Sequence, residues 1–236
     1  MSAGYPPQDL TCPDPAGCPI AVPDDLSGAR IVDFPANTEM VRVYDSTWGF
    51  DEANPGFGDA RFGPFDSVDG SRVPTMYLAQ NQTGALLETV FHDAEPGYGE
   101  VYESTLRNHC LVSLSCPHAL RVVDLRDPEL ARMGVGRDAV ASSTAEHYPC
   151  TRRLARHFHS TGAAGILWHS RQAEFHRGAW RNVPASEVLV VFGDRIPLGR
   201  GDWTRLGPGA ISLVQDTGRT LVDEVATELD VTVVTD

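Results

Sequence analysis

Five side chains spread over the middle of the chain could do chemistry together, and they are Arg42, Arg61, Tyr77, Glu88 and Ser170. Arg42 lies inside an otherwise apolar segment, where burying a guanidinium is costly unless an anion partners it. A planar guanidinium binds a phosphate or a carboxylate through two parallel hydrogen bonds. The two arginines therefore indicate a binding site for a small anionic ligand.

Each position also has a plainer interpretation when it is taken alone. Arg42 could form an internal ion pair with Asp45 or Glu88, which would satisfy its charge without a ligand. Arg61 could be a solvated loop residue, although the glycines beside it would let the backbone approach a ligand closely. Core packing, a helix surface and a turn are the corresponding alternatives for Tyr77, Glu88 and Ser170. The residues by themselves leave both interpretations open.

The composition excludes several classes of site and partner. The chain of 236 residues has a formal net charge of -13, and all 19 of its basic residues are arginine. Without lysine it can form neither a lysine Schiff base nor a P-loop lysine contact. Its acidity disfavours bulk nucleic acid and anionic membranes as partners, since both require a basic surface. An arginine cluster in such a chain favours a small anionic ligand.

The cysteines are Cys12, Cys18, Cys110, Cys116 and Cys150, an odd number at low density, which argues against a disulfide framework. The first two and the next two are each separated by five residues, a wider gap than in common zinc knuckles. A four-cysteine zinc site joining the two pairs is the alternative, but we expect unpaired thiols and no metal. The sequence shows no signal peptide and no apolar stretch of membrane-spanning length, so we expect a cytoplasmic protein.

Hydrophobic periodicity predicts one α+β domain with a mixed β-sheet core and flanking helices. Expected strands cover residues 40–45, 74–79, 119–125, 165–169, 187–192, 210–215 and 230–234. Expected helices cover 81–92, capped by Asn81 or Thr83, a segment capped by Asp127, and 150–160. Residues 49–70 form an expected long loop, which the four phenylalanines in it indicate to be ordered.

Several separated blocks agree, in order, with one protein family. Arg42 is followed by GDARFGP around Arg61, MYLA at Tyr77 and ALLETVF at Glu88. The later blocks ALRVVDL, Tyr148–Arg152 and GILWHS continue the series as far as Ser170. Over residues 38–195 the chain resembles the RES domain family, which takes its name from an arginine, a glutamate and a serine. These three correspond to Arg42 or Arg61, to Glu88 and to Ser170.

The resemblance implies a fold similar to that of ADP-ribosyltransferases and an enzyme whose substrate is NAD+. The expected reaction cleaves the nicotinamide–ribose bond, with water or inorganic phosphate as acceptor, in a toxin of a bacterial toxin–antitoxin pair. Transfer of ADP-ribose to a protein is one alternative, and a module that binds a nucleotide or partner without turnover is another. The resemblance also implies a helix-turn-helix antitoxin that covers the site, and homo-oligomers are compatible with the sequence.

The resemblance further suggests roles for the five candidate residues. Glu88, Arg42 and Tyr77 would be catalytic, with Glu88 stabilising oxocarbenium-like charge on the ribose. The NAD+-binding residues would be Arg42 and Arg61 at the pyrophosphate, Tyr77 at the nicotinamide ribose, and Ser170 at a ribose or phosphate oxygen. No metal and no cofactor other than the substrate are expected.

Three segments are expected along the chain. Residues 1–37 would form an irregular lead-in, and residues 38–195 would form the RES-like catalytic domain. Residues 196–236 would form a C-terminal extension that packs on that domain.

Overall fold

The computed structural model describes residues 6–20, 22–23, 25–94, 97–136, 140, 145–170, 186–196 and 203–236. Within this part of the chain the strands form one eight-stranded sheet and two two-stranded sheets. The large sheet runs in the order β1 (Ile31–Phe34), β8 (Leu120–Asp124), β9 (Gly165–His169), β10 (Glu187–Phe192), β5 (Thr75–Ala79), β2 (Glu39–Asp45), β7 (His109–Ser115) and β11 (Thr204–Ser212). Its neighbours are antiparallel except β8 and β9, which are parallel. This is the mixed sheet of the predicted α+β class.

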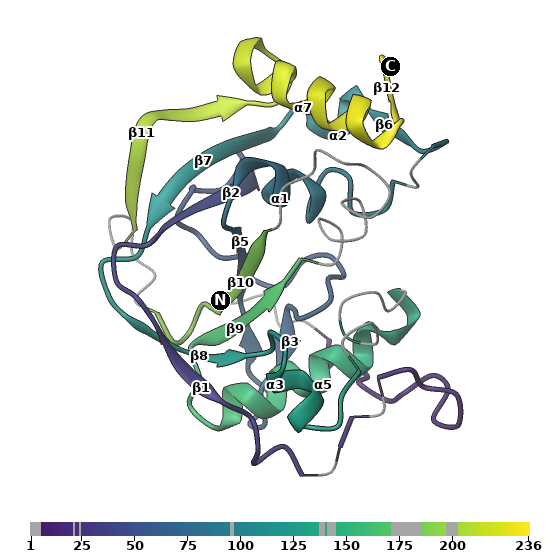
Figure 1. Ribbon diagram of the computed structural model, residues 1–236, viewed down its shortest axis with the longest axis vertical. Helices are drawn as coiled ribbons and strands as arrows, with labels where there is room; N and C mark the ends of the chain where they lie inside the picture. The colour runs from purple at the N-terminus through teal and green to yellow at the C-terminus, as the bar shows by residue number, and fades with distance from the viewer. Residues whose placement is uncertain are drawn as a thin grey trace.

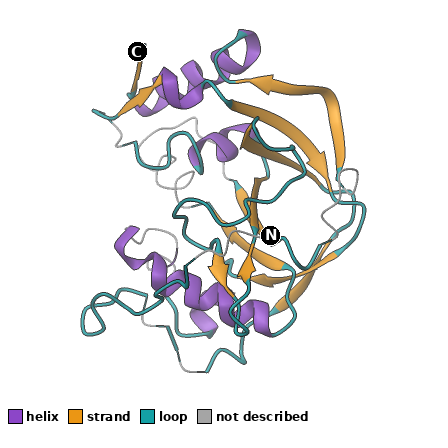
Figure 2. Ribbon diagram, turned by 180° about the vertical axis from the view of Figure 1, so that it is seen from behind, coloured by secondary structure: helices purple, strands orange, loops and turns teal. Residues whose placement is uncertain are grey.

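Smaller elements flank this sheet. The pairs are β3 (Phe65–Asp66) with β4 (Arg72–Val73), and β6 (Glu100–Tyr102) with β12 (Thr232–Val234). The helices are α1 (Gln82–Leu87), α2 (Glu103–Leu106), α3 (Glu129–Arg132), the 3-10 helix η1 (Ala145–His147), α5 (Tyr148–Ser160) and α7 (Asp216–Leu229). In Figure 1, α1 and α7 lie against the half of the sheet that contains β2, β7 and β11, and α5 lies against the other half. Seen from behind, the helices gather at two ends while the sheet curves along one side (Figure 2).

Two apolar cores form on opposite faces of the large sheet. In β10, Val188, Val190 and Phe192 join the larger core, while Leu189 and Val191 join the smaller one. All five side chains are fully buried. A continuous apolar run of this kind is typical of a strand that is covered on both faces.

The long helix α5 follows from an amphipathic sequence. Its first turn contains Pro149, whose missing N–H costs no hydrogen bond at that position. Thr151, Leu154, Ala155 and Phe158 recur at helical spacing, and all four are at most 1% exposed. One face of α5 is therefore fixed against the larger core, which also fixes the position of its first turn.

Helix α1 is shorter than the predicted span of 81–92. Asn81 caps it as expected, but the helix ends at Leu87 and Glu88 occupies the C-cap. The N–H groups of Val90 and Phe91 both donate to the Leu86 carbonyl, so the chain turns there and buries Phe91. Glu88 consequently lies at the end of a helix and not in its middle.

Other differences concern the ends and the middle of the chain. The predicted irregular segment 1–37 contains β1, and the region 92–118 contributes the unpredicted strand β7. The expected Asp127 cap is wrong, because α3 begins at Glu129 without a side-chain cap. The strand predicted over 210–215 joins the large sheet as β11 but begins earlier, whereas 230–234 supplies β12, which pairs with β6 instead.

Helix α7 was not predicted, although its buried residues have helical spacing. Val222, Val225, Ala226 and Leu229 are all at most 6% exposed and follow an i, i+3, i+4, i+7 pattern. The threonines and valines of this helix favour strands locally, because branching at Cβ restricts the side chain in a helix. Packing on the core overrides that preference.

None of the helices within the described residues is long and apolar enough to cross a membrane.

Close packing between β9 and β10 makes Gly165 sensitive to substitution. A Cβ atom at this position would lie 2.3 Å from the Val190 carbonyl oxygen, so the backbone would have to move. We expect Gly165→Ala to lower the free energy of unfolding by about 1–3 kcal/mol, measured by urea denaturation. Gly28→Ala is the matched control, because a Cβ there meets nothing within 4 Å. Equal stability of the two variants would contradict this packing.

Candidate active site

A cavity of about 500 Å³ opens where β2 and β5 separate in the large sheet. The two strands pair only at Val41 and Ala79. Beyond that pair, residues 42–45 of β2 and 75–77 of β5 line the cavity. Loop residues 57–61 and Glu88, the C-cap residue of α1, form further parts of the wall, and Glu52 and Asp93 also line it. The site is therefore built at the weakest pairing within the sheet.

Glu88 is held in place by its helix and by a buried hydroxyl. Leu86 and Leu87 are fully buried, which fixes the end of α1 on the core. The Ser170 hydroxyl donates a hydrogen bond to Glu88 Oε1 at 2.5 Å. Ser170 follows β9, is itself fully buried, and donates its backbone N–H to the Ser186 carbonyl. The carboxylate at the cavity wall is thus oriented from behind by a rigid part of the sheet.

Arg42 fastens the loop that follows β2. Its two terminal nitrogens donate to the Phe50 and Glu52 carbonyl oxygens at 2.5 Å and 2.7 Å. The guanidinium lies 5.5 Å from the centre of the Tyr44 ring. Burial lowers the pKa of Arg42 to about 10, so the group is still charged at neutral pH. The sequence allowed an ion pair of Arg42 with Asp45 or Glu88. Both of these hydrogen bonds instead go to backbone carbonyls.

Arg61 is the second cation of the cavity wall, and it is only 7% exposed. Its Nη1 donates to the Val140 carbonyl at 2.7 Å. Its guanidinium lies over the Tyr148 ring, 5.4 Å from the ring centre, a favourable cation–π position. Two elements distant in sequence therefore fix this arginine.

The first turns of α5 hold the loop that carries Arg61. Thr151 donates its hydroxyl to the Arg61 carbonyl oxygen. Arg152 donates from Nε to the Ala60 carbonyl at 3.1 Å and forms an ion pair with Asp59. These bonds connect a cavity loop to a helix that is anchored in the core.

Tyr77 lies on β5 with its hydroxyl directed at the same loop. The Phe62 backbone N–H donates to the Tyr77 oxygen at 2.8 Å. The tyrosine ring packs edge-on against Trp168, with ring centres 6.0 Å apart. Burial raises the pKa of Tyr77 well above its ordinary value, so the phenol stays protonated at neutral pH and can donate its O–H.

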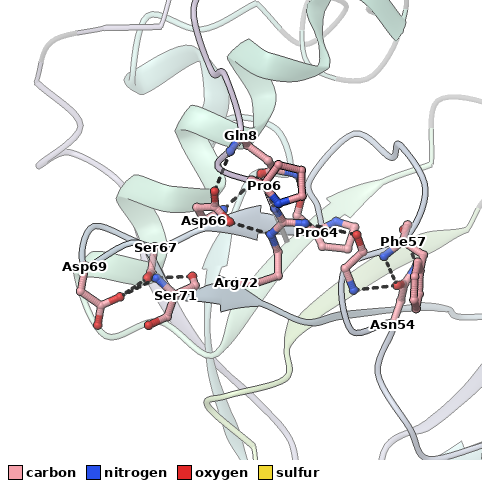
Figure 3. Close-up of polar contacts among 11 residues, drawn as sticks. Pro6, Gln8, Asn54, Phe57, Pro64, Asp66, Ser67, Asp69, Ser71 and Arg72 are labelled. Carbon is pink, nitrogen blue, oxygen red and sulfur yellow. Dashed lines mark hydrogen bonds and ion pairs between the residues drawn. The ribbon is translucent and has the colours of Figure 1, made fainter. Parts of the chain in front are cut away.

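The segment that follows loop residues 57–61 is tied to the start of the described chain (Figure 3). Gln8 donates twice there, from its backbone N–H to the Asp66 carboxylate at 2.7 Å and from its side-chain amide to the Pro64 carbonyl at 2.8 Å. Arg72 binds the same Asp66 carboxylate through Nε at 2.6 Å. Gln8, from the segment expected to be an irregular lead-in, thus holds the residues that follow the loop.

The structure adds residues that sequence reasoning did not select. His92 lines the cavity, and its Nε2 lies 3.2 Å from the Tyr148 hydroxyl. Trp48 and Phe57 also line it, with ring centres 5.9 Å apart, and are 46% and 53% exposed. His92 directly follows the ALLETVF block, but nothing in the sequence marks the histidine itself, so only tertiary contacts reveal its place.

The candidate residues from the sequence fall into two groups. Arg42, Arg61, Tyr77 and Glu88 all line the one cavity. Ser170 lies behind Glu88 and reaches the cavity only through that carboxylate. The arrangement can place two cations around an anion such as a pyrophosphate, and one oriented carboxylate beside a developing positive charge.

Removing the Tyr77 hydroxyl should destabilise the cavity loop, because it leaves the Phe62 N–H without its acceptor. We expect Tyr77→Phe to lower the free energy of unfolding by about 1–3 kcal/mol, measured by urea denaturation. Tyr102→Phe is the control, since that side chain is 44% exposed and its hydroxyl reaches a surface carboxylate. If both variants had the free energy of unfolding of the wild type, the Tyr77 hydrogen bond would not contribute to stability.

Comparisons with known proteins give the family and the fold. A family model described as the RES domain matches residues 35–200. A chain in the crystal structure of the M. tuberculosis MbcT–MbcA toxin–antitoxin complex is similar, with a TM-score of 0.53 and 13% identity. That similarity covers 85% of this chain and 93% of the other, and at this identity it shows the fold alone. No curated protein matches the chain.

Proposed function

Because this chain belongs to the RES domain family, we propose that it cleaves the bond between nicotinamide and ribose in NAD+, with water or inorganic phosphate as acceptor. The observation that carries the proposal is the Glu88 carboxylate, which Ser170 orients at the wall of a cavity. Arg42, Arg61 and Tyr77 line the same cavity. Two buried arginines and one oriented carboxylate would face the anionic pyrophosphate and the ribose of this substrate, respectively.

The two arginines of the wall complement the anionic part of NAD+. Its pyrophosphate is anionic, and a guanidinium is the side chain best suited to bind it through paired hydrogen bonds. Arg42 uses two of its N–H groups on carbonyls, and a guanidinium has five. The cavity volume of about 500 Å³ lies within the range of about 300–1,000 Å³ that small-molecule sites occupy.

Glu88 would act on the ribose as the bond breaks. The electron pair of the C–N bond leaves with nicotinamide, which becomes neutral, and positive charge develops on the ribose ring. A carboxylate that is already oriented stabilises this charge without having to reorganise. The oxygen of the acceptor then bonds to the ribose carbon, and its proton passes to solvent.

Ser170 has a different place in this proposal from the one expected from the sequence. It is fully buried and is not among the residues that line the cavity. Its hydroxyl would position the Glu88 carboxylate and would not contact a ribose or phosphate oxygen itself. Tyr77 would donate its O–H to the substrate near the nicotinamide ribose.

A toxin role with a protein antitoxin is part of the proposal. Family membership supports it, and the similar M. tuberculosis chain comes from a complex of a toxin with its antitoxin. Trp48 and Phe57 are large exposed aromatic residues at the cavity. Aromatic side chains of this kind are enriched at protein interfaces, so a partner that covers the cavity would find anchoring groups there.

Replacing the Glu88 carboxylate by an amide tests the chemistry. We expect Glu88→Gln to lower kcat by about 100- to 1,000-fold, because a charge-stabilising group of this kind contributes about 2.7–4 kcal/mol. The measurement is nicotinamide release from NAD+, with and without phosphate, with the second product identified by mass. Glu224→Gln, on the exposed side of α7, is the matched control and should turn over normally.

The outcomes of this experiment separate the alternatives. ADP-ribose as product indicates hydrolysis, and ADP-ribose-1″-phosphate indicates phosphorolysis. Full activity of Glu88→Gln would remove Glu88 from the mechanism. NAD+ that is bound but intact would indicate a binding module, and a labelled protein would indicate an ADP-ribosyltransferase.

The positioning role of Ser170 predicts a distinct kinetic effect. We expect Ser170→Ala to lower kcat by about 10- to 100-fold, since a hydrogen bond to a charged group contributes about 1.5–3 kcal/mol, while KM for NAD+ stays near the wild-type value. Ser160→Ala, an exposed serine whose hydroxyl donates to a helix carbonyl, is the control. A rise in KM with kcat unchanged would indicate direct substrate contact instead.

A further inference from the structure

Three cysteines and one histidine converge on the side of α5 where the start of the described chain packs. Cys12 and Cys18 come from the irregular segment before β1, His147 ends η1, and Cys150 lies in the first turn of α5. One ligand atom from each of these four residues lies within 4.8 Å of all the others. None of the four lines the cavity, so the proposed chemistry does not account for them.

The spacing of the sulfur atoms fits a shared metal ion. Cys18 Sγ and Cys150 Sγ are 3.7 Å apart, and all the cysteines of the chain are outside disulfides. A disulfide would need a separation of about 2.05 Å. Two thiolates on one tetrahedral zinc ion, each with a Zn–S bond of about 2.3 Å, lie about 3.8 Å apart. The sulfur pair is therefore at the edge length of a zinc tetrahedron.

His147 supplies an independent sign of a ligand. The residue is only 7% exposed, and its Nδ1 has no hydrogen-bond partner. A buried polar atom without a partner carries a desolvation cost of about 1–3 kcal/mol. Its Nε2 lies 3.2 Å from the Glu146 carboxylate, an arrangement that keeps the proton on Nε2 and leaves a lone pair on Nδ1. A metal ion among the sulfurs would satisfy that nitrogen.

We propose that Cys12, Cys18, His147 and Cys150 bind one Zn²⁺ ion through three thiolates and one imidazole. Binding releases the three thiol protons to solvent. All four coordination positions of the zinc ion are then filled by protein ligands, as in a structural and not a catalytic zinc site. The carboxylate of Glu146 then supports the ligand histidine from the outer shell. This inference does not rest on the proposed reaction with NAD+.

The zinc site connects the start of the chain to the cavity wall. Cys150 directly precedes Thr151 and Arg152, the residues that hold the loop of Asp59–Arg61. Cys12 and Cys18 fix the preceding segment to the same turn of α5. A segment rich in proline, whose described residues before β1 form neither helix nor strand, thereby gains a fixed position.

Metal analysis of the purified full-length protein tests the site directly. We expect about one zinc ion per chain, measured by inductively coupled plasma mass spectrometry against protein concentration. Cys12→Ser combined with Cys18→Ser, and separately His147→Gln, should reduce zinc to background. Cys110→Ser is the matched control, because Cys110 belongs to the other pair with the same spacing and should leave the zinc content unchanged.

A second measurement keeps the test decisive if the variants do not fold. Wild-type protein is stripped of metal with a chelator and titrated with Co²⁺, which reports thiolate ligands by charge-transfer absorption and tetrahedral geometry by its ligand-field bands. One equivalent of Co²⁺ with both signatures, and a rise in the thermal midpoint on adding Zn²⁺ alone, is the expected result. Protein that is isolated without zinc and shows no thiolate–cobalt absorption would overturn the proposal, as would iron in place of zinc or zinc retained by His147→Gln.

Discussion

The site depends on the need of buried guanidinium groups for oxygen partners. Arg42 and Arg61 are each only 7% exposed, and a cation in that environment must be solvated by the protein itself. Backbone carbonyls do this, from Phe50 and Glu52 for the first arginine and from Val140 for the second. Each arginine therefore fixes a loop while it contributes positive charge to the cavity. The same hydrogen bonds order the loops and hold the cations that a ligand would meet.

The elements of the cavity wall are fixed one after another, beginning from the apolar core. The larger core fixes α5, the first turns of α5 fix the loop around Arg61, and this loop lines the cavity. On the opposite side, buried leucines fix α1 and Ser170 orients the carboxylate at its end. The chemically useful groups are all one or two hydrogen bonds away from an apolar core, which is the arrangement that keeps them oriented before a ligand arrives.

Sequence reasoning recovered those parts of the fold that local pattern determines. The central strands carry apolar, β-branched runs, and Arg42, Arg61, Tyr77 and Glu88 stand in blocks with recognisable order. It failed where tertiary contacts decide: α7 forms despite β-branched residues, and β1 and β7 gain their strand partners only from distant segments. The four metal-ligand candidates illustrate the same limit. The sequence predicted unpaired thiols, with a four-cysteine site formed with Cys110 and Cys116 only as the alternative, whereas folding brings Cys12 and Cys18 to Cys150, more than half the chain away.

The single residue pair between β2 and β5 has a consequence for local opening of the native structure. Backbone hydrogen bonds join the strands on each side of the β2–β5 boundary. Across the boundary itself, the main further contact is α1, which packs on both strands. The large sheet is therefore two cooperative halves joined by a short helix whose last turn presents Glu88. Partial opening along this line costs less than unfolding either half, and it changes the width of the cavity first. A ligand that contacts both β2 and β5 would bind the closed sheet more tightly than the opened one. Ligand binding would therefore stabilise the sheet against opening between these two strands.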